Sequence, residues 1–225
     1  MTVATIKTDR QILEDVLQEL TWDSRVDETD VAVGVDGGIV TLSGTMDSLA
    51  KRSAAVEAAH RVLGVLDVAD EIQIKLPGDR RHTDAEIAHA VRFALEWDAF
   101  VPDQRIRSTV SDGCVTLEGE VATLREKEDA AKIVRSLAGV KGLHNFIRVE
   151  TAKAEPVALR QAIERALARR AEREAERIRV HVENGTVVLE GRVRTWPEKK
   201  AVLGAVGHAA GVEEVRDRLS VNPWE

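Results

Sequence analysis

The chain has 225 residues, of which 44% are hydrophobic and 32% are charged, a composition typical of a globular protein. Its net charge of -7 argues against nonspecific DNA binding as the main task. A single cysteine, Cys114, excludes an intramolecular disulfide framework and a cysteine-based zinc cluster. We expect this cysteine to be a small, buried or half-buried filler.

The amino-terminal residues do not form the continuous apolar segment of a secretory signal, and no apolar run approaches the length of a membrane-spanning helix. We therefore expect a cytoplasmic protein. Charge is unevenly spread along the chain. Residues 1–76 carry 7 Lys and Arg against 14 Asp and Glu, whereas residues 151–225 carry 14 against 12. The first third is thus strongly acidic and the last third weakly basic.

Residues 1–76 predict a helix, a hairpin, a second helix and a third strand, in that order. The first helix is indicated by apolar residues four positions apart: Ile12, Val16 and Leu20. Alternating valines at 31–35 predict a strand, and the Asp-Gly-Gly sequence at 36–38 reverses the chain into another. Helical spacing returns at 49–62, with Gly64 as the expected C-cap, and apolar residues at 65–74 indicate the last strand.

The same order of elements recurs twice more along the chain. Gly44, Gly119 and Gly191 end the repeated hairpin sequence at separations of 75 and 72 residues, and Gly64, Gly139 and Gly211 repeat those separations. We therefore predict an α+β protein of three tandem α-β-β-α-β domains at 1–76, 83–150 and 156–225, each a small three-stranded sheet covered by two helices. The third strand fits the pattern beside either the first or the second.

The glycine of the second strand has two interpretations. A strand glycine allows a ligand or another backbone to approach closely, or it makes room for a helix or a bulge. Because Gly44, Gly119 and Gly191 recur in domains whose surfaces differ, we favour a structural role for them. Gly64, Gly139 and Gly211 are interpreted as structural in the same way.

The repeated pattern resembles the BON domain, a family named for bacterial osmotically inducible and nodulation proteins. The resemblance rests on Asp-Gly-x-Val-x-Leu-x-Gly, an Ala-rich helix, and a Gly-Val pair before a short strand, and it covers nearly the whole chain three times. It implies non-enzymatic α/β domains that bind phospholipid membranes or other ligands in stress-related envelope proteins. Many family members are exported, whereas we expect this protein to be cytoplasmic.

No arrangement in the sequence predicts catalysis, a metal site or a cofactor. The histidines are scattered without a His-x-x-x-His pair, and we expect them at surface or half-buried positions: His60, His82, His89, His144, His181 and His208. The glycines punctuate hairpins and helix ends and do not form a phosphate loop. We therefore predict that the protein is not an enzyme and has neither a metal nor a cofactor.

Two tryptophans end the first helices of the first two domains. Trp22 and Trp97 are interpreted as caps on the hydrophobic layer, and the alternative is an exposed amphipathic ring available to a membrane or a neighbouring domain. The third domain has Arg169 at this position. The role of the third domain is therefore expected to differ from the roles of the first two domains.

The stretch from Arg160 to Arg179 is the strongly basic part of the chain. The favoured interpretation is a solvated helix with internal ion pairs. The alternative is a contact for anionic lipid headgroups, or for the acidic first domain of another molecule, through Arg165, Arg169, Arg173 and Arg177. The expected function is a stress-related binding or scaffolding protein, with peripheral binding to anionic phospholipid membranes, or sensing of a small ligand or cation, as alternatives.

Overall fold

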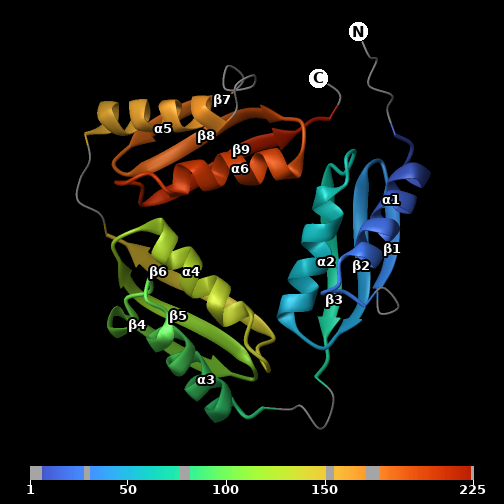
Figure 1. The fold of residues 1–225 in the computed structure, drawn as a ribbon, viewed down its shortest axis with the longest axis horizontal. Helices are drawn as coiled ribbons and strands as arrows, with labels where there is room; N and C mark the ends of the chain where they lie inside the picture. The colour runs from blue at the N-terminus through green and yellow to red at the C-terminus, as the bar shows by residue number, and fades with distance from the viewer. Residues whose placement is uncertain (1–6, 28–30, 77–81, 151–154, 171–177, 224–225) are drawn as a thin grey trace. The chain divides into compact units, whose positions relative to one another are not determined.

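The computed structural model describes residues 7–27, 31–76, 82–150, 155–170 and 178–223, except for the side chains of residues 168–170. It contains three units that share one order of α-helices and β-strands, each a three-stranded sheet with two α-helices (Figure 1). The first unit comprises α1 (Asp9–Trp22), β1 (Val31–Asp36), β2 (Ile39–Met46), α2 (Leu49–Arg61) and β3 (Asp67–Ile74). The second comprises α3 (Asp84–Trp97), the 3-10 turn η3 (Asp103–Arg105), β4 (Ile106–Ser111), β5 (Cys114–Val121), α4 (Leu124–Arg135) and β6 (Gly142–Val149). The third comprises α5 (Pro156–Arg170), β7 (Ile178–Glu183), β8 (Thr186–Val193), α6 (Trp196–Gly207) and β9 (Glu214–Val221).

The predicted α+β class and the predicted element order are confirmed, and the strand order that the pattern left open is now defined. Each sheet has the order first, second, third strand, with the second strand in the centre. β1 and β2 pair antiparallel, as a hairpin requires, whereas β3 pairs parallel to β2. β4, β5 and β6 pair in the same way. The helix between the last two strands is therefore the crossover that a parallel pair needs.

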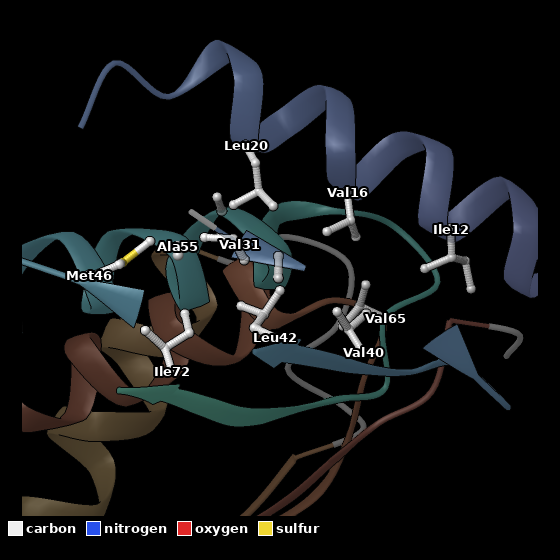
Figure 2. Close-up of a cluster of buried hydrophobic side chains, with 12 residues drawn as sticks. Ile12, Val16, Leu20, Val31, Val40, Leu42, Met46, Ala55, Val65 and Ile72 are labelled. Carbon is white, nitrogen blue, oxygen red and sulfur yellow. The ribbon is translucent and has the colours of Figure 1, made fainter. Parts of the chain in front are cut away.

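Each unit has its core between one face of the sheet and its helices. In the first unit the core is built from aliphatic side chains of both layers, and Figure 2 labels ten of them: Ile12, Val16, Leu20, Val31, Val40, Leu42, Met46, Ala55, Val65 and Ile72. Alternation along β2 sends Val40 and Leu42 into the core, while Ile39 stays half exposed. The small alanines of α2 let that helix lie close to the sheet. None of the described helices of the first unit covers the opposite face of its sheet.

α1, α2, α3 and α4 begin at capping residues, and α2 ends slightly earlier than predicted. Thr8 and Thr83 each form a capping box with the residue three positions later. α2 ends at Arg61 with Val62 as its C-cap, so Gly64 lies in the turn after the cap. Gly64 has a φ of +104°, and a Cβ there would lie 3.2 Å from side-chain carbons of Ile12. The glycine is therefore required by the close approach of this turn to α1.

A carboxylate in each of the first two units ties the first helix to the hairpin turn. Asp9 accepts hydrogen bonds from the backbone N–H groups of Gly37 and Gly38, both at 2.9 Å. Asp84 accepts from Asp112 at 2.8 Å and from Gly113 at 2.9 Å. We call this contact the carboxylate clamp. Its two N–H groups belong to consecutive residues of positive φ, a geometry that suits an anion.

The third unit has the same turn without the clamp. Asn184 and Gly185 have φ of +46° and +76°, close to the values in the other two turns. Pro156 stands at the position of Asp9 and Asp84, and its side chain has no oxygen to accept a hydrogen bond. The first helix of this unit is therefore held to the sheet chiefly by its apolar residues, Leu159, Ile163 and Leu167.

Asp84→Ala is expected to lower the free energy of unfolding of the second unit by about 1–3 kcal/mol, because two backbone N–H groups lose a charged acceptor. Urea titration, monitored by hydrogen exchange in peptides from residues 106–121, measures this loss. The matched variant is Pro156→Asp, which supplies the missing carboxylate and should slow exchange in residues 178–193. Equal exchange in Asp84→Ala and the wild type would contradict the role given to the clamp.

Candidate functional site

The predicted strand glycines lie where the first two strands meet most closely. Gly119 is paired with Ile106 across the sheet and has a φ of +139°. A Cβ at this position would lie 2.0 Å from the carbonyl oxygen of Arg105. Gly44 and Gly191 have φ of +136° and +145° at the equivalent positions. At Gly119 the close approach is thus made by the chain's own backbone, and the positive φ shared by all three glycines supports the structural interpretation.

The predicted basic contact lies only partly within the described residues. Arg165 is exposed on α5, where its Nε donates to the carbonyl oxygen of Gln161 at 3.1 Å. Arg160 pairs with Glu164 one turn away at 3.7 Å, which is the kind of internal ion pair expected of a solvated helix. Arg169 belongs to α5 but its side chain is not described, and Arg173 and Arg177 lie outside the described residues. A contact through these four arginines therefore stays a prediction.

The interpretation of Trp22 and Trp97 as core residues was wrong. Their side chains are 78% and 75% exposed, respectively. Both lie in the last turn of their helices, whose buried face consists of residues such as Leu20 and Leu95, two positions earlier. Two positions along a helix correspond to a rotation of about 200°, which turns the indole away from the sheet.

The second unit carries further exposed aromatic rings beside Trp97. Phe93 precedes it by one turn, and the two ring centroids lie 5.4 Å apart. Phe100 follows in the next loop, and the guanidinium of Arg125 lies 6.0 Å from its ring centroid. Phe93 and Phe100 are 60% and 72% exposed. We call Phe93, Trp97 and Phe100 the aromatic surface.

The loop that presents Phe100 is held by a dense set of hydrogen bonds. The backbone N–H of Phe100 donates to the carboxylate of Asp98 at 2.8 Å, and Val101 is buried next to it. Arg92 on α3 donates to the carbonyl oxygen of Asp103 at 3.2 Å and also pairs with the carboxylate of that residue. An exposed phenylalanine on a loop tied down in this way is pre-organised for contact, since little conformational entropy remains to be lost.

The first unit fills the equivalent positions with polar side chains. Gln18 stands in place of Phe93, and Arg25 stands in place of Phe100. Arg25 and Arg61 both donate to Asp23, each with a closest distance of 2.8 Å, and only 7% of the Asp23 side chain is exposed. The Arg25 guanidinium, helped by Arg61, holds the pKa of the Asp23 carboxyl well below its usual range. The aromatic surface is therefore a feature of the second unit.

Asp23→Asn is expected to reduce the free energy of unfolding by about 1–2 kcal/mol at pH 7, since both arginines are partly exposed and solvent weakens the pairs. The folded-state pKa is depressed, so this stabilisation is present above the usual value of 3.8 and is lost as pH falls below it. Urea titrations of both proteins between pH 7 and pH 2.5 measure the difference. A difference that grew as pH fell would contradict the assignment.

The described residues contain no grouping suited to a metal ion. In that part of the chain no three His, Cys, Asp or Glu residues are grouped so that they could hold a metal ion. The described histidines are exposed or half-buried, as predicted. None of the described helices is long and apolar enough to cross a membrane. The distinctive surface of these residues is apolar and aromatic.

Sequence reasoning missed Phe93 and Phe100, although the repeat contains the signal that finds them. Alignment of the units by their glycines places Phe93 opposite Gln18 and Phe100 opposite Arg25, so an aromatic residue replaces a polar one at both positions. A position that is polar in one copy of a repeated unit is expected to be exposed in the next. Comparison of the copies would therefore have identified both rings as exposed.

Comparison with known proteins identifies a family and a curated relative. A family model described as the BON domain matches residues 8–75, 83–151 and 157–223. Osmotically-inducible protein Y of Escherichia coli (strain K12) is 27% identical over 152 residues, covering 66% of this chain and 76% of the relative. Among solved structures, the C-terminal domain of CdsD, a structural protein of the type III secretion system of Chlamydia trachomatis, is 13% identical. That match covers 96% of this chain and 100% of the CdsD chain with a TM-score of 0.27.

Proposed function

Because the chain belongs to the BON domain family, in three copies that cover most of its length, we propose that it is a non-enzymatic binding or scaffolding protein of the osmotic stress response. The stress context comes from the relative named osmotically-inducible protein Y. The binding role is assigned to the aromatic surface of the second unit. The first unit then serves mainly as a structural copy of the same fold.

The observation that carries the proposal is the exposure of Phe93, Trp97 and Phe100 at the end of α3 and in the loop that follows it. Leaving large aromatic rings in water has a free-energy cost, and such rings contribute strongly to binding when a partner covers them. Contiguous exposed apolar surfaces on otherwise well-packed proteins mark interaction sites. A non-enzymatic partner contact explains this surface without any catalytic group.

The test replaces the aromatic surface with the residues of the other copies. Phe93→Gln and Phe100→Arg install the first unit's residues, and Trp97→Arg installs the third unit's. In a strain that lacks the gene and grows poorly at high osmolarity, the triple variant is expected to restore less than about a tenth of the wild-type effect. The matched control is Phe146→Ser, since Phe146 is a similarly exposed phenylalanine on the open sheet face of the same unit.

Full rescue by the triple variant at equal protein level would contradict the proposal. Equal loss in the Phe146→Ser control would show that the effect is not specific to the aromatic surface. The far-ultraviolet circular dichroism of each variant separates a lost contact from a lost fold.

A second candidate function is peripheral binding to anionic phospholipid, and the aromatic surface is also the observation that favours it. Trp97 combines an apolar ring with a polar N–H, the chemistry that membrane interfaces select. Arg125, beside Phe100, adds a cation that an anionic headgroup attracts. Sedimentation with vesicles of phosphatidylglycerol and phosphatidylcholine tests this second function, and its expected signature is co-sedimentation of the wild-type protein that the triple variant loses.

A further inference from the structure

The open faces of the second and third sheets carry charged pairs at a position where the first sheet is uncharged. In the second unit Arg107 on β4 lies opposite Glu118 on β5. In the third unit Arg179 on β7 lies opposite Glu190 on β8. The equivalent residues of the first unit are Ala32 and Ser43, also directly opposite each other. The charges are therefore not required by the fold.

In the second unit these charges line a cleft of about 690 Å³ on the open face of the sheet. We call it the charged cleft, and its charged lining comes from β4, β5, β6 and the turns at their ends: Arg105, Arg107, Glu118, Glu120, Arg148 and Glu150. Arg148 pairs with Glu120 at 2.7 Å. Among the described residues, Arg105, Arg107, Glu118 and Glu150 have no ion pair within 4.0 Å.

The charged cleft thus presents both guanidinium and carboxylate groups that are not committed to each other. A guanidinium binds a carboxylate through parallel hydrogen bonds, and a carboxylate accepts hydrogen bonds from an ammonium group. A simple anion would approach Glu118 and Glu150, and a simple cation would approach Arg105 and Arg107. A ligand that carries both charges can place its anionic group near the arginines and its cationic group near the glutamates, so that like charges are kept apart.

We infer that the charged cleft of the second unit binds a small zwitterion, with its carboxylate on Arg105 and Arg107 and its ammonium group on Glu118 and Glu150. This site is separate from the aromatic surface, so the two assignments can fail independently. The inference also gives a ligand class to the small-ligand alternative considered for this protein. Because all four side chains are exposed, binding is expected to be weak, on the order of millimolar.

The third unit offers a built-in comparison. Its cleft has a similar volume of about 690 Å³ and includes Arg179, His181, Glu190 and Arg218. There Glu190 is already paired with Arg218 at 2.8 Å, and Glu164 is paired with Arg160. Arg179 therefore faces carboxylates that already have partners. We expect this cleft to prefer a simple anion over a zwitterion.

The experiment is a titration of the full chain followed by amide NMR. Glycine, β-alanine and γ-aminobutyrate present the two charges at increasing separation, and sodium acetate and ammonium chloride at equal ionic strength present each charge alone. The expected result is a saturable change in the chemical shifts of the Arg107 and Glu118 amides on addition of a zwitterion. The dissociation constant of the zwitterion is expected to be at least about fivefold lower than that of acetate. Arg107→Ala and Glu118→Ser install the first unit's residues, and each is expected to weaken zwitterion binding about tenfold.

Two results would overturn the inference. The first is no saturable shift of these amides by any of the three zwitterions up to about 50 mM. The second is equal binding of acetate and zwitterion with no effect of Glu118→Ser, which would make the cleft an anion site only. Arg179→Ala should leave the titration of the second unit unchanged, and preserved amide dispersion shows that each variant is folded. The triple variant of the aromatic surface should bind the zwitterion normally.

Discussion

Gly119→Val is expected to unfold the second unit. The Cβ of any side chain at this position would lie 2.0 Å from the carbonyl oxygen of Arg105 and 3.2 Å from the Cα of Ile106. Both contacts are with backbone, so no side-chain rotation relieves them. Valine also disfavours the φ of +139° found here. Relief requires that β4 separates from β5, and the expected loss exceeds about 4 kcal/mol.

Hydrogen exchange of peptides from residues 106–121 measures this result, and peptides from residues 31–46 report on the first unit in the same sample. The matched control is Gly34→Val, since Gly34 also lies in a strand but a Cβ there would meet no atom within 4 Å. Valine favours strands, so Gly34→Val should leave protection unchanged or raise it slightly. A folded Gly119→Val protein with the wild-type exchange pattern would show that the approach of Arg105 does not require glycine.

Leu42→Ala is expected to lower the free energy of unfolding of the first unit by about 3–4 kcal/mol. The side chain is fully buried in the central strand, where Figure 2 shows it beneath α1 among the other core residues. The unit is small, and its other core residues cannot close the cavity without moving the sheet pairing. The loss therefore includes a cavity contribution as well as the transfer of the deleted carbons.

Ile39→Ala is the control for this variant, because Ile39 lies on the same strand but is 48% exposed on the other face. Its effect is expected to stay below about 1 kcal/mol. Urea titration with hydrogen exchange of residues 31–46 compares the two. Similar losses for both variants would mean that the core does not lie on the face assigned to it.

The elements of the fold were predictable from the sequence because three copies agree on them. Periodicity gave the face of α1 through Ile12, Val16 and Leu20, and these residues are buried. The position of β3 was not predictable, because the alternation of its side chains is the same beside β1 as beside β2. The order became clear only from the parallel pairing, such as that of Val40 with Val68. Gly64 was predicted to be the C-cap of α2, but the C-cap is Val62 and Gly64 lies in the turn beyond it.

The candidate site was predicted less well, for a physical reason. Trp97 was assigned to the core on its hydrophobicity, whereas its direction on the helix places it in solvent. Hydrophobicity alone does not separate a core ring from a contact ring, since both exclude water once their partner is present. The uncommitted charges at Arg107 and Glu118 were also missed, because the register that brings them opposite each other depends on the hairpin turn.

The carboxylate clamp also affects the order in which the units fold. It joins groups 28 and 29 residues apart, so the loop that it closes is short and its closure entropy is small. In the first two units, helix and hairpin can associate during synthesis before the parallel strand has left the ribosome. The third unit has Pro156 at this place and must gain its stability from later, less local contacts. It is therefore expected to be the slowest of the three to fold, and the one that depends most on chaperones.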